Sequence, residues 1–322
     1  MEYVRLGSTE LSVSVAGLGC GGSSRLGTVT GNSKKDSINI VKRALELGVN
    51  FFDTAKAYGT EEIVGEALQG TKRDDVIIST KSLVRRGGKF FSAHEFQSGL
   101  ESSLSSLKMD YIDIFHLHAV LADDYWRVKD ELVPVLLRAK EDGKIRHLGI
   151  TESPPNDYGH SLLEQVFKEN CPFEVIMFGF HLMHQNARSS VFPATAREDI
   201  GTLIMFAVRS IFSDAHYLAS KLKELSDNGL LPGIYNEIAI FQELLIGKGG
   251  AESIIDAAYR YARHEPGANV VLLGTGNLEH LETNIKSILR PPLKESALKI
   301  LEKDFSELEG VGLDLPRGYR ER

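Results

Sequence analysis

The chain has 322 residues, with 37 Lys plus Arg against 44 Asp plus Glu and a formal net charge of −7 at pH 7. This acidic balance offers no basic surface for nucleic acid or anionic lipid, so the sequence predicts no partner of either kind. Hydrophobic residues make up 42% and charged residues 25% of the chain, as in ordinary globular proteins. We therefore expect a globular protein with a substantial buried core.

The compartment follows from the N-terminus and the cysteines. Met1–Arg5 has no apolar stretch of the kind found in secretory signals, and no run approaches the roughly 18 apolar residues of a membrane span. Cys20 and Cys171 are too few for a disulfide framework and fit free thiols in a reducing compartment. The sequence predicts a cytoplasmic protein that does not enter membranes.

Short apolar runs rich in Val, Ile and Phe recur along the chain, separated by longer amphipathic stretches. They lie at 15–18, 50–52, 76–79, 111–117, 147–150, 174–178, 203–206 and 270–273. Strands that alternate with helices pair in parallel through right-handed crossovers. Eight such runs in a chain of this length favour a closed (β/α)8 TIM barrel over an open doubly wound sheet.

The helical periodicity between these runs supports the alternation. It is found at 37–47, 60–68, 95–107, 254–262 and 278–289. Before the first run, alternating apolar residues around Gly7 and Ser8 predict an N-terminal β-hairpin.

One interval breaks the alternation. Residues from about 209 to 250, after the seventh strand, are predicted to form an elaborated loop insertion with a helix near 219–225. Residues from about 305 to 322 are predicted to form a C-terminal tail. Because no linker or shift in composition marks a boundary, residues 1–322 are expected to form a single barrel domain.

The segment Gly17–Gly22 satisfies the dinucleotide-binding pattern G-x-G-x-x-G and follows a predicted strand. That motif requires a helix directly after the glycines, whereas residues 23–34 are polar and the next periodic helix begins near Ser37. We therefore interpret the glycines, Gly21 and Gly22 included, as a turn at the end of the first barrel strand, where the backbone approaches a bound group closely.

Four polar residues of complementary type follow successive strands. Asp53, Lys81 and His118 lie at the ends of the second, third and fourth strands, and Tyr58 lies five residues after Asp53. The C-terminal ends of barrel strands converge on one mouth, so these side chains should meet. A nearby ammonium stabilises a phenolate, a carboxylate keeps the buried ammonium charged, and an imidazole can orient a carbonyl group.

At these residues the sequence resembles the aldo-keto reductase superfamily, over nearly the whole chain. The resemblance is carried by GVNFFDTAKAYG (48–59), EEIVGEAL (61–68), ISTK (78–81), SL (106–107), DYID (110–113), GKIR (143–146), LGI (148–150), LGTGN (273–277) and EHL (279–281) near Asn284. It implies an NAD(P)-dependent barrel oxidoreductase that interconverts a carbonyl group, in an aldehyde, ketone or sugar, and an alcohol by hydride transfer. The family's catalytic tetrad falls on Asp53, Tyr58, Lys81 and His118, with Tyr58 as proton donor or acceptor.

The resemblance also implies cofactor contacts, in which this chain departs from the usual residues. Thr151 and Glu152 stand where the family offers Ser-Asn to the nicotinamide, and Met177 stands where Gln is usual. Met205 and Phe206, followed by Arg209, occupy the region of a stacking aromatic ring; for Met177, Met205 and Phe206, plain filling of the barrel is an equal alternative. The phosphate-binding segment falls on Gly274, Thr275, Gly276 and Asn277, with His280 and Asn284 beyond it.

The charge of this segment favours NAD(H) over NADP(H). Residues 274–284 contain no Lys or Arg, whereas Glu279 and Glu282 are acidic. A 2′-phosphate would find little to pair with there. Arg209, Lys286 and Arg290 are the basic residues left to reach it.

Two alternatives start from other classes of protein. His116 and His118 lie two apart on one strand and therefore share a face, as in metal-dependent barrel hydrolases, with His147, His181 and His184 as further ligands. That pair normally lies on the first strand of those hydrolases, so no metal is predicted and His116 is interpreted as a buried residue satisfied by a neighbour. A non-catalytic nucleotide-binding regulatory relative is the second alternative, disfavoured by the intact tetrad. The substrate is a small molecule of unspecified identity, and a monomer is expected because no apolar stripe requires a partner.

Overall fold

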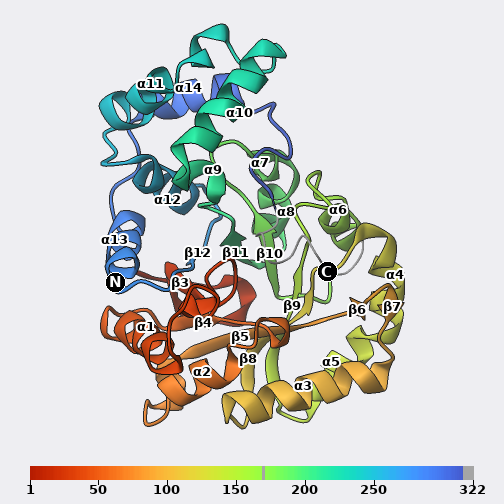
Figure 1. Cartoon of the computed structure of the whole chain (residues 1–322). Coiled ribbons are helices and arrows are strands. Elements are labelled where there is room, and N and C mark those ends of the chain that lie inside the picture. The colour runs from red at the N-terminus through yellow and green to blue at the C-terminus, as the bar shows by residue number, and fades with distance from the viewer. Residues whose placement is uncertain (169–170, 315–322) are drawn as a thin grey trace.

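The computed structural model describes residues 1–168 and 171–314 and has a closed parallel barrel at its centre (Figure 1). Its strands are β3 (Ala16–Gly19), β4 (Phe51–Asp53), β5 (Ile77–Leu83), β8 (Ile112–His118), β9 (Ile145–Thr151), β10 (Val175–Gly179), β11 (Gly201–Met205) and β12 (Val270–Leu273). They pair in chain order, and β12 returns to β3. Each of the eight predicted apolar runs forms one of these strands, so the predicted barrel is confirmed.

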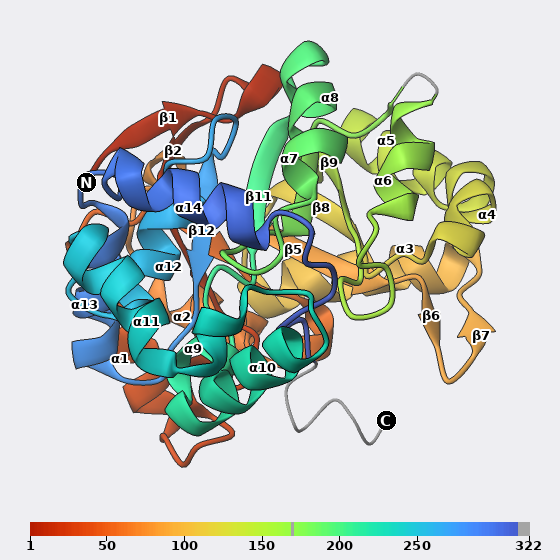
Figure 2. The ribbon, with the colours of Figure 1, turned by 90° about the horizontal axis from the view of Figure 1, so that it is seen from above.

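Helices surround the barrel on its outer side (Figure 2). They are α1 (Lys34–Glu46), α2 (Glu61–Ala67), α3 (Ala93–Leu107), α4 (Tyr125–Glu131), α5 (Val133–Glu141), α6 (Ser161–Phe167), α7 (Ala187–Ser190), α8 (Phe192–Arg197), α9 (Ser210–Ser213), α10 (Ala215–Asp227), α11 (Ile238–Gln242), α12 (Ile254–Arg263), α13 (Leu278–Ile288) and α14 (Glu295–Phe305). Ser33 and Ser92 begin α1 and α3 with reciprocal capping boxes, which explains why these helices start at those residues.

The glycine-rich segment after β3 does not open into a helix. It turns through a short 3-10 helix at Arg25–Gly27, and α1 begins only at Lys34. The dinucleotide-binding interpretation that the motif alone suggests is therefore excluded by the local geometry.

The predicted N-terminal hairpin is present and closes one end of the barrel. Strands β1 (Tyr3–Arg5) and β2 (Ser12–Ser14) pair antiparallel. Leu6, Leu11 and Val13 pack on residues at the beginnings of the barrel strands and join one inner hydrophobic cluster with them. The barrel therefore has an apolar, covered end below and a polar mouth above, where the strands end.

The predicted insertion after the seventh strand contains regular structure. It holds α9, α10, a 3-10 turn at Gly233–Asn236, α11 and a π-helix at Glu243–Lys248. The helix expected near 219–225 is the middle of α10. Helices α10, α11 and α14 lie together on one side of the barrel, away from α3 and the short hairpin of β6 (Arg85–Arg86) and β7 (Lys89–Phe90) (Figures 1 and 2).

Helix α14 and the hairpin of β6 and β7 are absent from the predicted elements. Ala297, Leu301 and Phe305 lie four residues apart on the buried face of α14, so its pattern is present in the sequence. The C-terminal tail, predicted from about 305, begins where α14 ends. Leu308 and Leu313 of this tail are buried, and residues 315–322 lie outside the described residues. Among the described helices, none has both the length and the apolar character to cross a membrane.

Candidate active site

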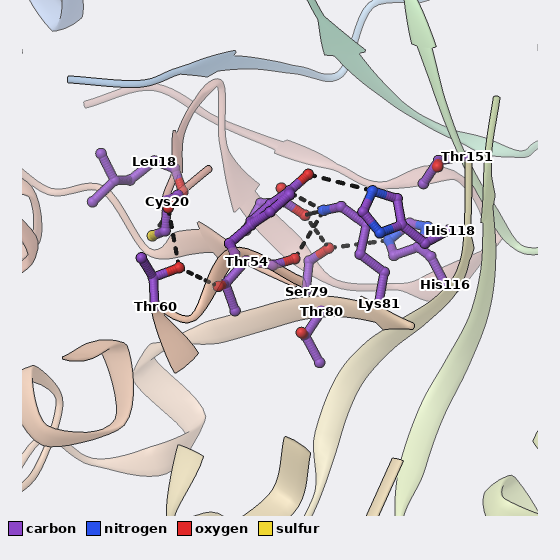
Figure 3. Close-up of polar contacts among 12 residues, drawn as sticks. Leu18, Cys20, Thr54, Thr60, Ser79, Thr80, Lys81, His116, His118 and Thr151 are labelled. Atoms are coloured by element: carbon purple, nitrogen blue, oxygen red, sulfur yellow. Dashed lines mark hydrogen bonds and ion pairs between the residues drawn. The ribbon is translucent and has the colours of Figure 1, made fainter. Parts of the chain in front are cut away.

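The four predicted catalytic residues meet at the mouth of the barrel. Asp53 ends β4, Lys81 lies in β5 and His118 ends β8, and Tyr58 comes from a 3-10 turn at Lys56–Tyr58 between β4 and α2. Figure 3 shows Lys81 and His118 side by side at the strand ends. The convergence follows from parallel strands whose carboxyl ends face the same way.

Asp53 and Lys81 form a buried ion pair. The Lys81 ammonium lies 2.7 Å from both carboxylate oxygens of Asp53 and donates a further hydrogen bond to the carbonyl of Thr54 at 2.9 Å. Lys81 is 1% exposed and Asp53 is 3% exposed. Burial raises the pKa of the Asp53 carboxyl, while the Lys81 charge and the Ser79 hydroxyl oppose that rise. The pair places one fixed positive charge in a dry part of the mouth.

Tyr58 lies directly above this charge. The Lys81 Nζ is 5.4 Å from the centroid of the Tyr58 ring. The Tyr58 hydroxyl lies 3.4 Å from Nε2 of His118, and the two rings meet edge to face. On the other side, a Cβ at Gly21 would come within 2.4 Å of the Tyr58 ring, so only glycine fits there. The phenol is thus held between a glycine, an ammonium and an imidazole.

The His118 imidazole is neutral at physiological pH. Burial, and secondly the positive charge of Lys81, lower the pKa of His118 to about 3. A neutral ring can accept or donate one hydrogen bond but has no acidic imidazolium proton to give near neutral pH. The His118 ring therefore has no acidic proton to offer at neutral pH, whereas the Tyr58 hydroxyl beside it carries one.

Ser79 and His116 extend the site below the tetrad (Asp53, Tyr58, Lys81 and His118). The Ser79 hydroxyl donates to Oδ1 of Asp53 at 2.8 Å and lies 3.0 Å from Nε2 of His116. Ser79 was not a predicted site residue. Its signal is the two-residue spacing from Lys81, which puts both side chains on the inner face of one strand.

The predicted neighbour of His116 is thus Ser79, and the metal-binding alternative finds no support in the geometry. Across residues 1–168 and 171–314, no three His, Cys, Asp or Glu side chains are grouped as metal ligands would be. His147, offered as a further ligand, instead lies 2.8 Å from the Glu174 carboxylate.

Thr151 and Glu152 follow β9, and protein partners hold both side chains. The Thr151 hydroxyl accepts a hydrogen bond from the backbone N–H of Ala119 at 2.8 Å. The Glu152 carboxylate accepts one from the N–H of Gly179 at 2.9 Å and lies 2.8 Å from Nδ1 of His160. Both residues are buried. Their bonds within the protein leave them less available to a ligand than their position in the sequence suggests.

The sixth and seventh strand ends are largely apolar. Met177 is 2% exposed and belongs to the inner hydrophobic cluster, so it fills the barrel. Met205 and Phe206 are half-buried at the mouth, and Phe206 has a left-handed backbone with φ of 69°. The guanidinium of Arg209 lies 4.1 Å from the centroid of the Phe206 ring.

The turn between β12 and α13 offers backbone groups to an anion. Gly274 is exposed, and a Cβ at Gly276 would lie 2.4 Å from Cα of Gly27, so the two loops approach as only glycine allows. Asn277 caps α13 by accepting from the N–H of His280 at 3.0 Å. His280 is exposed and Asn284 half-buried on the same helix. An exposed glycine turn before an eleven-residue helix fits the diphosphate of a nicotinamide dinucleotide.

Two arginines around α13 pair with acidic side chains, whereas Lys286 of the same helix is exposed. Arg290 pairs with Glu252 and lies 3.5 Å from Asp256, beyond the far end of α13. Arg43 of α1 lies 2.8 Å from Glu282 and neutralises that acid. Glu279, in the first turn of α13, is exposed.

Comparison with known proteins identifies the family to which the chain belongs. The family model described as the aldo/keto reductase family matches residues 18–303, and the chain belongs to that family. Its members are oxidoreductases that act on small carbonyl compounds with NAD(P)H, and the resemblance of the sequence to them is confirmed.

The relatives are distant along the full length. The chain is 28% identical to the uncharacterized oxidoreductase YqkF of Bacillus subtilis over 315 residues, which cover 94% of this chain and 96% of that protein. It is 36% identical to L-galactose dehydrogenase of Arabidopsis thaliana over 160 residues, about half of each chain (48% and 49%). The holo form of aldo-keto reductase AKR11C1 from Bacillus halodurans has the same fold, with a TM-score of 0.71 at 23% identity over 100% of both chains.

Proposed function

We propose that this protein is an NAD(P)-dependent oxidoreductase that interconverts the carbonyl group of an aldehyde, ketone or sugar and the corresponding alcohol, with Tyr58 as the acid or base. The observation that carries the proposal is the buried Asp53–Lys81 pair directly beneath the Tyr58 phenol. Neither folding nor simple binding requires a charged lysine under a tyrosine ring at the mouth of a barrel, because burying that charge is costly.

Each residue of the tetrad has one task. When bound, the nicotinamide cofactor supplies or accepts the hydride at the carbon atom. Tyr58 gives its hydroxyl proton to the oxygen that becomes the alcohol, and takes a proton back in the reverse direction. The Lys81 ammonium stabilises the phenolate that remains, Asp53 holds Lys81, and the neutral His118 ring fixes the direction of the carbonyl oxygen.

The residues that would hold the cofactor surround this point. Gly274–Asn277, His280 and Asn284 would bind the diphosphate and the adenosine half through backbone amides and the start of α13. Gly21 lets the Tyr58 ring pack against the backbone, Gly22 has open space beside it, and Phe206 with Arg209 would add a further wall of the cofactor site. Thr151, Glu152, Met177 and Met205 would border the nicotinamide pocket from below, as the inner surface of the barrel.

Tyr58→Phe tests the assignment of the acid. We expect turnover to fall by at least about a hundredfold, because the proton donor is lost, while the dissociation constant for NADH changes little. Calorimetric titration and steady-state rates over a panel of aldehydes, ketones and sugars, with L-galactose and NAD⁺ for the reverse direction, measure both. Tyr3→Phe, at an exposed tyrosine of β1, is the matched control. Near-native turnover by Tyr58→Phe would refute the assignment. If the wild type bound cofactor but never turned over, the non-catalytic regulatory alternative would be favoured.

We further propose that NAD(H) is preferred over NADP(H). Glu279→Arg should shift the ratio of the two dissociation constants toward NADP(H), since it replaces an acid in the first turn of α13 with a phosphate-binding side chain. His280→Arg should shift it the same way. Paired titrations with NADH and NADPH measure the ratio; an unchanged ratio in both variants would contradict the proposed position of the adenosine end. We also propose that the protein is a monomer and that it acts in the cytoplasm, a reducing compartment that its two free cysteines fit.

A further inference from the structure

The histidine pair of β8 has two different tasks, and the mechanism above uses only one of its members. His118 faces Tyr58, whereas His116 lies one layer deeper, fully buried. In Figure 3 the His116 ring points toward Ser79. The contacts of His116 therefore run toward the carboxylate side of the tetrad.

The direction of the hydrogen bonds follows from the number of protons. The Ser79 hydroxyl has one proton, which it donates to the Asp53 carboxylate at 2.8 Å. The 3.0 Å contact with His116 fits a ring that carries its proton on Nε2 and donates it to the Ser79 oxygen, since Nδ1 of that ring has no hydrogen-bond partner among the described residues. Burial, and then the Lys81 charge, lower the pKa of His116 well below its ordinary value, so the ring holds only that one proton. The chain of donors runs from His116 through Ser79 to Asp53.

The barrel makes specific room for this chain. His116 is in register with Gly149 of β9, where a Cβ would lie 2.1 Å from Nδ1 of the ring. Two residues earlier on β5 and β8, the inner positions are Ile77 and Ile114, both in the hydrophobic cluster. The inner surface thus changes from apolar to polar at Ser79 and His116, immediately below Asp53. A layer with only a packing role would continue the apolar pattern, because buried polar groups cost free energy unless bonded.

We propose that Ser79 and His116 are positioning residues that fix the Asp53 carboxylate, and through it the place of the Lys81 ammonium under Tyr58. Both oxygens of Asp53 contact Lys81 at 2.7 Å, so rotation of the carboxylate moves the ammonium. The hydrogen bond from Ser79 to Oδ1 prevents that rotation. His116 keeps the Ser79 hydroxyl oriented toward Asp53. This inference rests on the proposed role of Tyr58 as the acid.

The charges that act on Tyr58 can be named. Among the described residues, the titratable groups around this end of β3, β4, β5 and β8 are Lys81, Asp53, His118, His116, Cys20, and the neighbouring Lys56 and Glu61. The Glu61 carboxylate accepts from the Thr80 hydroxyl of β5 at 2.7 Å, and burial raises its pKa. Both histidines are neutral, because burial lowers the pKa of each, and burial raises the pKa of the Cys20 thiol, which stays protonated. The acidity of the phenol therefore depends on where the Asp53–Lys81 pair holds its positive charge. An ammonium at this range lowers an acid's pKa by roughly one to three units.

The test is the ionisation of Tyr58 itself, measured without cofactor. The ultraviolet phenolate signal of each protein is compared with that of the same protein carrying Tyr58→Phe, so that the difference reports Tyr58 alone. We expect Ser79→Ala and His116→Leu to raise the Tyr58 midpoint by about one pH unit, because the ammonium is held less closely. The high-pH limb of carbonyl reduction should move by the same amount, and kcat should fall about tenfold with little change in KM.

The controls separate positioning from packing. His116→Gln keeps an N–H donor toward Ser79 and should restore most of the midpoint. Ser14→Ala removes an equally buried hydroxyl, which donates to the Ala16 carbonyl at 2.8 Å near the opposite end of the barrel, and should leave the midpoint unchanged. Should one variant fail to fold, the other and His116→Gln still report the midpoint.

A wild-type midpoint in Ser79→Ala or in a folded His116→Leu would overturn the proposal. An equal shift in Ser14→Ala would overturn it as well, because the effect would then be general loosening. Failure of the proposed function would look different: the wild type would not bind or turn over NAD(P)H, whatever the midpoint of Tyr58 does.

Discussion

Asp53 and Glu152 are buried carboxylates that follow two different barrel strands, and they differ in the base that each one contacts. Asp53, at the end of β4, holds Lys81, and Glu152, after β9, holds His160 at 2.8 Å. Burial raises the pKa of both carboxyl groups. A lysine side chain is in general a much stronger base than an imidazole, so the two pairs differ in how easily a proton can pass from base to carboxylate. The second pair, with its imidazole, can neutralise itself by moving one proton.

The Asp53–Lys81 pair can act on the chemistry of the mouth, whereas the Glu152–His160 pair has a structural role. Only the Asp53–Lys81 pair lies under an acidic side chain, Tyr58, whose ionisation it can influence. The Glu152–His160 pair ties the end of β9 to the loop before α6, and His160 continues to Asn186 at 3.1 Å. We therefore expect loss of the first pair to affect chemistry and stability together, and loss of the second to affect mainly stability.

Lys81→Met should have the largest effect. Removing the ammonium leaves a buried carboxylate without its cation, which should cost about 3–5 kcal/mol of unfolding free energy. Turnover should fall by about a thousandfold, because the phenolate loses its stabilising charge. Urea unfolding and steady-state kinetics measure the two effects. Lys34→Met, at an exposed lysine paired with Glu62 and Glu66, is the control and should change neither. If Lys81→Met retained most of its turnover, the Asp53–Lys81 pair would have no special role in the chemistry, and the two pairs would not differ in the way proposed.

Glu152→Gln should have the intermediate effect. We expect a loss of about 1–3 kcal/mol, because the His160 ring and the Gly179 N–H lose a charged acceptor, and turnover within a fewfold of wild type. A double-mutant cycle with His160→Gln should give a coupling of about 1–3 kcal/mol. If Glu152→Gln instead abolishes turnover as Lys81→Met does, Glu152 takes part in the chemistry.

The pH dependence of this second pair sharpens the comparison. Burial lowers the pKa of His160, but Glu152 and Asn186 outweigh it, and the net shift is upward. The stabilisation from protonating His160 is therefore full below the ordinary histidine pKa near 6.5 and is lost as the pH rises through the folded value. Glu152→Gln should remove this loss between neutral and alkaline pH.

His184→Leu should have the smallest effect on the free energy of unfolding at neutral pH. The contribution of His184 to stability depends on pH in the opposite direction to that of His160. His184 is fully buried, and neither ring nitrogen has a hydrogen-bond partner among the described residues. Burial, and then the charge of His160, lower the pKa of His184 to about 3. Its neutral form stabilises the fold above pH 6.5, and this is lost as the pH falls from 6.5 toward 3, at up to about 1.4 kcal/mol per pH unit.

Unfolding curves at pH 7, 6 and 5 measure that slope. In His184→Leu, the free energy of unfolding should fall less steeply with decreasing pH than in the wild type, by up to about 1.4 kcal/mol per pH unit. At pH 7 it should change little. Equal slopes in the two proteins would show that His184 is protonated in the folded state.

The two pairs also differ in how far the sequence predicts them. Asp53 and Lys81 lie at strand ends, and the geometry of a parallel barrel brings strand ends together whatever the loops do. His160 lies in a loop with a left-handed backbone, φ 59°, and its approach to Glu152 depends on a turn that no periodicity encodes. Ser79 lies between these cases: the two-residue repeat of β5 places it below Lys81, but only the structure shows Asp53 and His116 as its partners. The same reason explains why the eight strands follow from apolar runs, while within 209–250 only the helix near 219–225 follows from its periodicity.

The hairpin that closes the lower end of the barrel has a consequence for folding. Arg5 lies 2.9 Å from Asp199, and the N–H of Ser8 donates to the Asp199 carbonyl at 2.6 Å. Arg5 is therefore held by a residue 194 positions later in the chain, and such long-range contacts form slowly. Before the segment around Asp199 has folded, the barrel surface that Leu6, Leu11 and Val13 cover is incomplete. The N-terminal hairpin therefore packs on the barrel late in folding. A bulky fusion at the N-terminus would consequently slow the closing step of folding while leaving the chemistry of the mouth intact.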